Sequence, residues 1–231
     1  MRHQSEALKP AGFFITGTDT GVGKTLVASM LIRGLVAEGR RVAAMKPVAA
    51  GAVSTPAGLR NDDALCLAAA ANVETPYETL NPYCLRAPVS PHIAAEEARI
   101  VIDPAVIRRE FDVICASADC VVVEGAGGWL APIGGHRTME DIAVALGLPV
   151  ILVVGLRLGC LNHAGLTARA IRASGLRLAH WVANEIDPSF ERRAKNVATL
   201  SAALGAPLAV VPYAGTSAAP RTGHATIRVS L

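Results

Sequence analysis

A chain of 231 residues, of which 52% are hydrophobic, is large enough to bury one sizeable α/β core or two small ones. Its net charge of +3 is too small to indicate nucleic acid or an anionic membrane surface as a partner. The five cysteines show no CxxC or Cys/His metal spacing and are scattered through apolar segments, which predicts buried thiols in a reducing compartment.

The polar stretch at 1–10 does not match a signal peptide, and the longest apolar segments contain glycines and charges, unlike a membrane span. We therefore expect a cytoplasmic protein. No linker rich in Pro, Gly or Ser interrupts the middle of the chain, so a single domain is expected. We assign residues 12–213 to this domain, residues 1–11 to an N-terminal extension, and residues 214–231 to the domain's C-terminal tail.

The first predicted unit is a strand, a glycine-rich turn and a helix. The apolar run at 13–15 predicts a buried strand, residues 26–36 predict a helix, and three glycines followed by Lys24 and Thr25 lie between them. The N–H groups of such a turn attract phosphate. Lys24 would reach the outer phosphates, and the Thr25 hydroxyl would ligate magnesium. Gly17 stands one residue earlier than the usual loop pattern requires, so the alternative is a tight turn with a chance Gly-Lys-Thr.

Strands and helices then alternate along the chain. Further strands are predicted at 41–48, 120–124, 149–155, 178–184 and 207–211, and further helices at 61–70, from 103 onward, and at 138–147, 161–174 and 189–204. Residues 49–60 are expected to form a loop, and residues 74–91, with four prolines, an irregular segment facing a substrate. This alternation predicts one α/β domain of the phosphate-loop NTPase type, with a mostly parallel, doubly wound sheet flanked by helices.

Polar side chains stand where predicted strands end, which is where ligands of such sheets bind; they are Lys24, Lys46, Glu124 and Asn184. Glu124 would hold magnesium or cap a turn. Lys46 would neutralise a transferring phosphoryl group or would carry only a solvated head group. Asn184 would recognise a base edge or cap a turn. Asp63, beside Asp62, would be a second magnesium ligand or a helix cap, and the spacing leaves both readings open.

Several segments together resemble the dethiobiotin synthetase family, in the family's order and over residues 12–213. They are 17–25, 46–51, 59–64, 90–92, 124–129, 158–163 and 181–184. The resemblance implies an ATP- and Mg2+-dependent carboxylation and ring closure of 7,8-diaminononanoate (diaminopelargonate) with CO2. The implied products are dethiobiotin, ADP and phosphate, formed through a carbamate and a carbamic-phosphate intermediate.

The resemblance also implies residue roles. Lys46 and Lys24 would be catalytic, and the metal ligands would be Thr25, Asp63 and Glu124. Nucleotide contacts are expected from Gly21, Val22, Gly23, Lys24, Thr25, Leu26, Asp63, Glu124, Gly125, Ala126, Gly127, Asn184, Glu185, Pro212, Tyr213 and Ala214. Substrate contacts are expected from Lys46, Ala50, Ser90, Gly159, Cys160, Leu161 and Asn162. The last four open a helix whose N-terminus would bind the substrate carboxylate across the interface of a homodimer.

Two residues depart from the family pattern: Ala50 stands where members carry a substrate-contacting serine, and Gly21 where some carry a glutamate. The main rival interpretation is a partitioning or regulatory switch ATPase with a related loop, but that class has a lysine near the start of the loop where this chain has Asp19. Two further rivals are an amidoligase relative, a class that usually carries further domains, and a nucleotide-binding protein that has lost catalysis. The second is disfavoured because the expected site residues are all present: Lys24, Thr25, Lys46, Asp63 and Glu124. The choice among ATP, CTP and GTP stays open.

Overall fold

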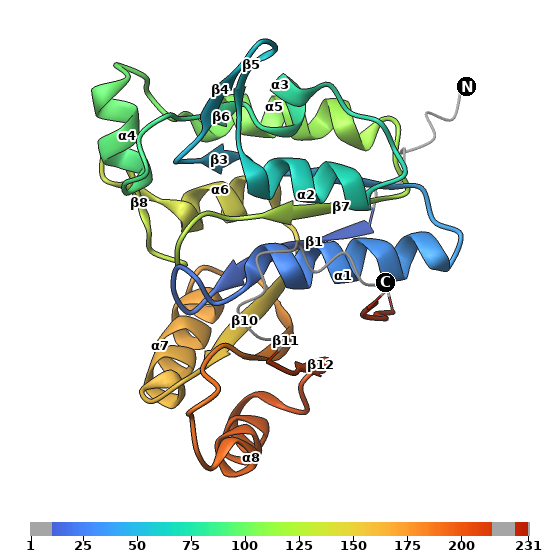
Figure 1. The fold of residues 1–231 in the computed structure, drawn as a ribbon, viewed down its shortest axis with the longest axis vertical. Helices are drawn as coiled ribbons and strands as arrows, with labels where there is room; N and C mark the ends of the chain where they lie inside the picture. The colour runs from blue at the N-terminus through green and yellow to red at the C-terminus, as the bar shows by residue number, and fades with distance from the viewer. Residues whose placement is uncertain (1–10, 214–224, 231) are drawn as a thin grey trace, which may run out of the picture.

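At the centre of the fold lies a six-stranded sheet in the spatial order β12-β11-β10-β1-β7-β2, in which all neighbouring strands run parallel. The computed structural model describes residues 11–213 and 225–230 (Figure 1). The strands are β1 (Ala11–Gly17), β2 (Val42–Met45), β7 (Cys120–Glu124), β10 (Val150–Leu156), β11 (Leu178–Glu185) and β12 (Ala209–Val211). The predicted α/β class with a mostly parallel sheet is confirmed, whereas the predicted domain boundaries stay a prediction.

Helices cover both faces of the sheet, because alternate residues of a buried strand point in opposite directions. Phe13 and Ile15 of β1 belong to one core, which they share with α1 (Lys24–Ala37) and α2 (Asp62–Ala70). Phe14 belongs to the opposite core, to which five other helices contribute: α4 (Pro91–Glu97), α5 (Pro104–Cys115), α6 (Met139–Leu146), α7 (Cys160–Ala173) and α8 (Arg193–Leu204). Figure 1 shows α1 and α2 on the same side of the sheet.

The strand order places the first loop at a crevice in the sheet. β1 lies between β7 and β10, and the chain leaves β1 through α1 to reach β2, on the far side of β7. β10 and the strands after it build the other half of the sheet. Connections therefore diverge from the carboxyl end of β1, which is the place where open α/β sheets bind their ligands.

The segments predicted as coil contain short elements. Residues 49–60 include a hairpin of β4 (Val53–Thr55) and β5 (Gly58–Arg60), and residues 74–91 include α3 (Tyr77–Leu80) and β6 (Tyr83–Cys84). The expectation of a loop and an irregular segment was therefore wrong in part. Gly58, at a φ of 99°, permits the tight hairpin turn. β6 pairs with the distant β3 (Val48–Ala49), a contact that no local pattern reveals.

Prolines misled the prediction because they begin helices here. Pro76 is the N-cap of α3, and Pro91 stands in the first turn of α4 (Pro91–Glu97), where a missing N–H costs nothing. Another short hairpin, β8 (Pro132–Gly134) with β9 (Arg137–Thr138), precedes α6. Helix α8 begins at Arg193 and not at residue 189, because Ser189 bonds the side chain of Asp187 in a local turn.

The cysteines and the C-terminal residues 225–230 can also be compared with the sequence predictions. All five thiols are free; Cys120 and Cys160 are buried, Cys84 and Cys115 are half-buried, and Cys66 is exposed, so burial was predicted wrongly for that residue. Residues 225–230 form neither helix nor strand. They still pack on α1, where Ile227 N donates to Met30 O at 3.1 Å. None of the helices in the described part of the chain is long and apolar enough to cross a membrane.

Candidate active site

The turn between β1 and α1 has the shape of a phosphate-binding loop, and its conformation requires glycine. Gly21 and Gly23 have φ values of 74° and 90°. A Cβ atom at Gly23 would lie 2.2 Å from Nδ2 of Asn184, which donates a 2.8 Å hydrogen bond to Val22 O. The buried end of β11 therefore contacts the phosphate loop directly, through the hydrogen bond from Asn184 to Val22 O. Asn184 was predicted to recognise a base or cap a turn, and the structure gives it this bracing contact.

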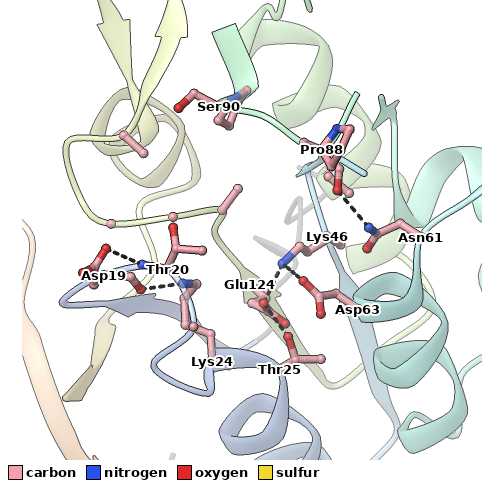
Figure 2. A pocket seen from close by; sticks show the side chains of 18 of the residues that line it. Asp19, Thr20, Lys24, Thr25, Lys46, Asn61, Asp63, Pro88, Ser90 and Glu124 are labelled. Carbon is pink, nitrogen blue, oxygen red and sulfur yellow. Dashed lines mark hydrogen bonds and ion pairs between the residues drawn. The ribbon is translucent and has the colours of Figure 1, made fainter. Parts of the chain in front are cut away.

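A cavity of about 830 Å3 opens in front of this loop, at the carboxyl ends of β1, β2 and β7 (Figure 2). Predicted site residues that line the cavity are Gly21, Gly23, Lys24, Thr25, Lys46, Ala50, Asp63, Ser90, Glu124, Ala126 and Gly127. Three of the four strand-end residues that the sequence placed along one edge of the sheet, Lys24, Lys46 and Glu124, thus converge on one space, whereas Asn184 does not line it. Residues predicted to contact the substrate and residues predicted to contact the nucleotide line the same cavity.

Four side chains from separate elements form the charged centre of the cavity. Lys46 Nζ lies 2.5 Å from Glu124 Oε1 and 2.9 Å from Asp63 Oδ2, and the Thr25 hydroxyl donates to Glu124 Oε1 at 2.9 Å. Lys46 and Glu124 are 3% and 0% exposed. Figure 2 shows these side chains pointing toward one another from β7, α1, α2 and the end of β2. Asp62 does not line the cavity, so the geometry singles out Asp63 of the two aspartates.

Electrostatics keep Lys46 charged. Burial alone would lower its pKa, but Glu124 and Asp63 together raise the pKa of Lys46 above its ordinary value. Burial likewise opposes ionisation of Asp63, yet Lys46 holds the pKa of Asp63 below its usual range. The ammonium group of Lys46 is therefore protonated at neutral pH and acts as a fixed positive charge.

Lys24 is the second cation of the cavity and titrates closer to neutrality. Burial and the neighbouring Lys46 lower the pKa of Lys24 to about 8. Its Nζ donates to the backbone carbonyl of Asp19 at 3.0 Å, while the Asp19 carboxylate pairs with Arg157 from the end of β10. The loop thus holds its lysine extended along its own inner surface (Figure 2).

The donor set suits a small, hard cation. Within the described part of the chain, Glu124 Oε2 is buried and has no hydrogen-bond partner. It stands beside a hydroxyl and near a second carboxylate, all oxygen donors. Among the described residues, no group of three or more His, Cys, Asp or Glu side chains is arranged to hold a metal ion on its own. Mg2+ characteristically uses one or two carboxylates together with water and phosphate oxygens, so two carboxylates and one hydroxyl fit it.

Other predicted residues lie outside the cavity wall. Val22, Leu26, Gly125 and Pro212 do not line it, and a Cβ atom at Gly125 would lie 3.1 Å from the ring of Phe14. Glu185 accepts hydrogen bonds from Arg193 and from the backbone of Tyr213. The turn of Gly159, Cys160, Leu161 and Asn162 opens α7, as predicted, but away from this cavity. Ala214 lies outside the described residues.

The sequence analysis did not assign several residues that line the cavity. They are Asp19, Thr20, Ala49, Asn61, Pro88, Val89, Pro91 and Ala131, while Gly128, the end of the predicted nucleotide-contacting stretch 125–128, also lines the cavity. Several of them stand next to residues that were assigned. Extending each sequence motif by one residue would therefore have found them. Asn61 was predicted only as a helix cap. It does cap α2, with its side chain accepting from Ala64 N, and it also donates from Nδ2 to Ala50 O at 3.3 Å.

Comparisons with known proteins agree with this geometry. Residues 11–221 match the family model described as AAA domain. A protein of Aromatoleum aromaticum named ATP-dependent dethiobiotin synthetase BioD is 50% identical over 206 residues, which cover 89% of this chain and 92% of that protein. A protein of the same name from Xanthomonas oryzae pv. oryzae (strain PXO99A) is 48% identical over 200 residues, covering 87% and 89%.

Solved structures with low sequence identity share the fold alone. The MinC:MinD cell division protein complex of Aquifex aeolicus contains a chain with a TM-score of 0.56 and 18% identity, covering 87% of this chain and 81% of that one. The septum site-determining protein MinD of Pyrococcus horikoshii has a TM-score of 0.52, 16% identity and the same two coverages. The much higher identity to the two dethiobiotin synthetases shows that this chain belongs to the family of ATP-dependent dethiobiotin synthetases, which are ligases of biotin biosynthesis.

Proposed function

We propose that this chain carboxylates and cyclises diaminopelargonate with CO2, at the expense of ATP and with Mg2+, to give dethiobiotin, ADP and phosphate. The observation that carries the proposal is the position of Lys46, whose ammonium lies between Glu124 and Asp63 in the cavity that the phosphate loop also lines. The names of the close relatives support the same overall reaction.

The proposed chemistry has three steps. One amine of the substrate attacks CO2, forms an N–C bond, loses a proton and becomes a carbamate. A carbamate oxygen then attacks the γ-phosphorus of ATP, and ADP leaves, which yields a mixed carbamic-phosphoric anhydride. The second amine attacks the carbonyl carbon and expels phosphate, and this closes the cyclic urea. Phosphorylation is needed because a carbamate anion is itself a poor electrophile.

Lys24 and Lys46 would make the second step possible. A carbamate and a γ-phosphate are both anions, so their approach requires concentrated positive charge in a site shielded from water. Lys46 supplies such a charge, since its carboxylate partners keep it protonated. Lys24 would contact the transferred phosphoryl group, and the loop N–H groups would hold the remaining phosphate oxygens. Catalysis would then rest on positioning and electrostatics, without a protein nucleophile.

Thr25, Asp63 and Glu124 would hold the magnesium ion. When bound, Mg2+ neutralises phosphate charge and orients the phosphate chain for in-line transfer. The unpartnered Oε2 of Glu124, among the described residues, supports this assignment, because a buried carboxylate oxygen is rarely left without a ligand.

The diamine would lie along the opposite wall of the cavity. Ala50, Pro88, Val89 and Ser90 line that wall, which combines apolar surface for an alkyl chain with one hydroxyl. Ala50 offers no hydroxyl, so Ser90 is the available side-chain donor there. We further propose that the carboxylate end of the substrate reaches the N-terminus of α7 in a second copy of the chain. Leu158, which is 90% exposed beside that helix start, supports an interface at this place.

Phosphate release in the presence of Mg2+ and ATP tests the proposal, with diaminopelargonate and bicarbonate added singly and together. Release that requires both, with dethiobiotin formed in step, is the expected result. Release that neither compound affects would instead favour a switch ATPase. Lys46→Gln should lower kcat by orders of magnitude while ATP still binds, and normal turnover would remove Lys46 from the catalytic role. The same assay with CTP and GTP determines the nucleotide preference.

A further inference from the structure

Lys46 and Asp63 are held together by more than their own ion pair. Lys46 follows β2, whereas Asp63 lies in the first turn of α2, and the hairpin of β4 and β5 separates the two segments in the chain. Their side-chain atoms nevertheless meet at 2.9 Å. The contacts that hold the backbone at Lys46 near the start of α2 therefore affect the geometry of this ion pair.

The backbone of Lys46 is bonded on both sides to the segment around α3. Lys46 N donates to Leu80 O at 2.8 Å, and Asn81 Nδ2 donates to Lys46 O at 2.6 Å. Asn81 is 2% exposed, so this amide bond is shielded from water. The end of α3 thus fixes the two peptide groups from which the Lys46 side chain extends.

The orientation of the Asn81 amide determines the rest of the chain of hydrogen bonds. A backbone carbonyl only accepts, so Nδ2 must face Lys46 O, and Oδ1 must then accept from the Tyr77 hydroxyl, 3.2 Å away. The same hydroxyl accepts from Asn61 N at 2.7 Å. Asn61 is the N-cap of α2, the helix that carries Asp63. One directed chain therefore runs from the start of α2 through Tyr77 and Asn81 to Lys46.

The ring of Tyr77 is held in place, and its hydroxyl stays protonated. The Arg60 guanidinium lies over its ring at 4.0 Å from the centroid, which restrains the ring independently of the hydroxyl. Burial raises the pKa of Tyr77, and the Cys84 thiol beside the hydroxyl acts in the same direction. The hydroxyl consequently remains a donor over the whole physiological pH range.

We propose that Tyr77 and Asn81 are positioning residues, which set the geometry between Lys46 and Asp63 and thereby the turnover rate. The inference rests on the roles proposed above for Lys46 and Asp63. Neither Tyr77 nor Asn81 lines the cavity, so both act through the residues to which they bond. Within the described part of the chain, no hydrogen bond joins the phosphate loop to Tyr77 or Asn81, so nucleotide affinity should depend little on these two residues.

Tyr77→Phe tests the proposal by removing one oxygen while keeping the ring under Arg60. We expect kcat to fall on the order of 10- to 100-fold, since a shift of about 1 Å in a catalytic group suffices for such a loss. At saturating Mg2+, KM for ATP should change by less than about twofold, because the lost interaction acts on the transition state and not on nucleotide binding. The Mg2+ concentration for half-maximal rate should rise, because Asp63 moves with α2.

Tyr83→Phe is the matched control. Its hydroxyl likewise accepts a backbone hydrogen bond, from Asp103 N at 3.0 Å, but among the described residues it forms no hydrogen bond with Lys46, Asn61 or Asn81. Both variants should lose similar thermal stability, whereas only Tyr77→Phe should lose kcat. Equal and small effects on kcat in the two variants would overturn the proposal, because a purely structural hydroxyl predicts that result.

Asn81→Ala provides an independent route to the same conclusion. Because Tyr77 and Asn81 act in one chain, the double variant should lose about as much kcat as the more damaging single variant, and the two losses should not multiply. Multiplying losses would contradict a shared pathway. Lys46→Gln in the same assay separates the two hypotheses. If Lys46→Gln is inactive but Tyr77→Phe is normal, only this inference fails. If Lys46→Gln is fully active, the proposed function of Lys46 fails first.

Discussion

Replacing Gly23 by alanine should damage the phosphate loop in a way that the structure allows to be divided into two parts. Gly23 combines a φ of 90° with a neighbour in the space of a side chain, since a Cβ atom would lie 2.2 Å from Asn184 Nδ2. Gly21 has a φ of 74° but open space around its Cβ position. The pair Gly23→Ala and Gly21→Ala therefore separates backbone strain from collision with Asn184.

The two contributions have different sizes. A left-handed conformation costs a non-glycine residue about 1–2 kcal/mol, and this applies to both variants. At Gly23 the new methyl group must also displace the Asn184 amide from Val22 O, and a buried hydrogen bond lost in this way costs about 1–3 kcal/mol. We expect Gly23→Ala to lower the free energy of unfolding by about 2–5 kcal/mol, and Gly21→Ala by about 1–2 kcal/mol.

Urea unfolding of both variants and of the parent protein, without nucleotide, measures these differences. Calorimetric titration with Mg-ADP then follows the loop itself, and Gly23→Ala should bind nucleotide more weakly than Gly21→Ala. Equal stability losses in the two variants would refute the reasoning, because the contact with Asn184 would then contribute nothing. A Gly23→Ala protein with unchanged stability would in addition contradict the strained loop geometry.

Three further changes probe other contacts. Lys24→Met should abolish phosphate binding yet stabilise the nucleotide-free protein by up to about 3 kcal/mol, because burial lowers the pKa of Lys24 from 10.5 to about 8. The gain in stability should be full below pH 8 and should vanish as the pH approaches 10.5. Thermal unfolding measured across this pH range checks both expectations. Thr25→Val should weaken Mg2+-dependent ADP binding by about 10-fold or more in calorimetry, and unchanged affinity would remove Thr25 from the metal site. Gly34→Ala should lose about 1–3 kcal/mol in urea unfolding, since its Cβ would meet Ile227 O at 2.1 Å; a stabilised variant would contradict this packing, as helix propensity alone favours alanine by about 1 kcal/mol.

Long apolar strands and helix caps were predictable from local pattern. The run at 120–124 and the cap at Asn61 depend on neighbours in the chain, and the structure places both as expected. The hairpin at 53–60 and the pair of β3 with β6 were missed, because their stability depends on partners that the local sequence does not specify. Proline clusters suggested irregular chain, although two of the prolines begin helices.

The candidate site was predictable in a similar, partial way. Topology alone brings strand-end residues to one edge of a parallel sheet, so Lys46 and Glu124 could be expected near the loop. Which aspartate of the 62–63 pair faces the cavity depends on how α2 is rotated, and the spacing left this open. Arg157 lies 138 positions from its partner Asp19, and no local signal connects them. The bonds of Tyr77 and Asn81 to Asn61 and Lys46 were hidden for the same reason.

The buried pair of Lys46 and Glu124 is the strongest argument that this cavity serves chemistry. Removing two charges from water costs several kcal/mol per ion, and a buried ion pair often stabilises a fold no better than apolar residues of the same volume would. A sheet built mainly from apolar residues, valine and alanine above all, has no structural need for such a pair at its edge. Strongly perturbed, mutually dependent ionisable groups gather at functional sites. A chance Gly-Lys-Thr turn gives no reason for Lys46 and Glu124 to meet beside it at 2.5 Å. A site that binds phosphate and a cation does give one, because it needs both a positive charge and a carboxylate there.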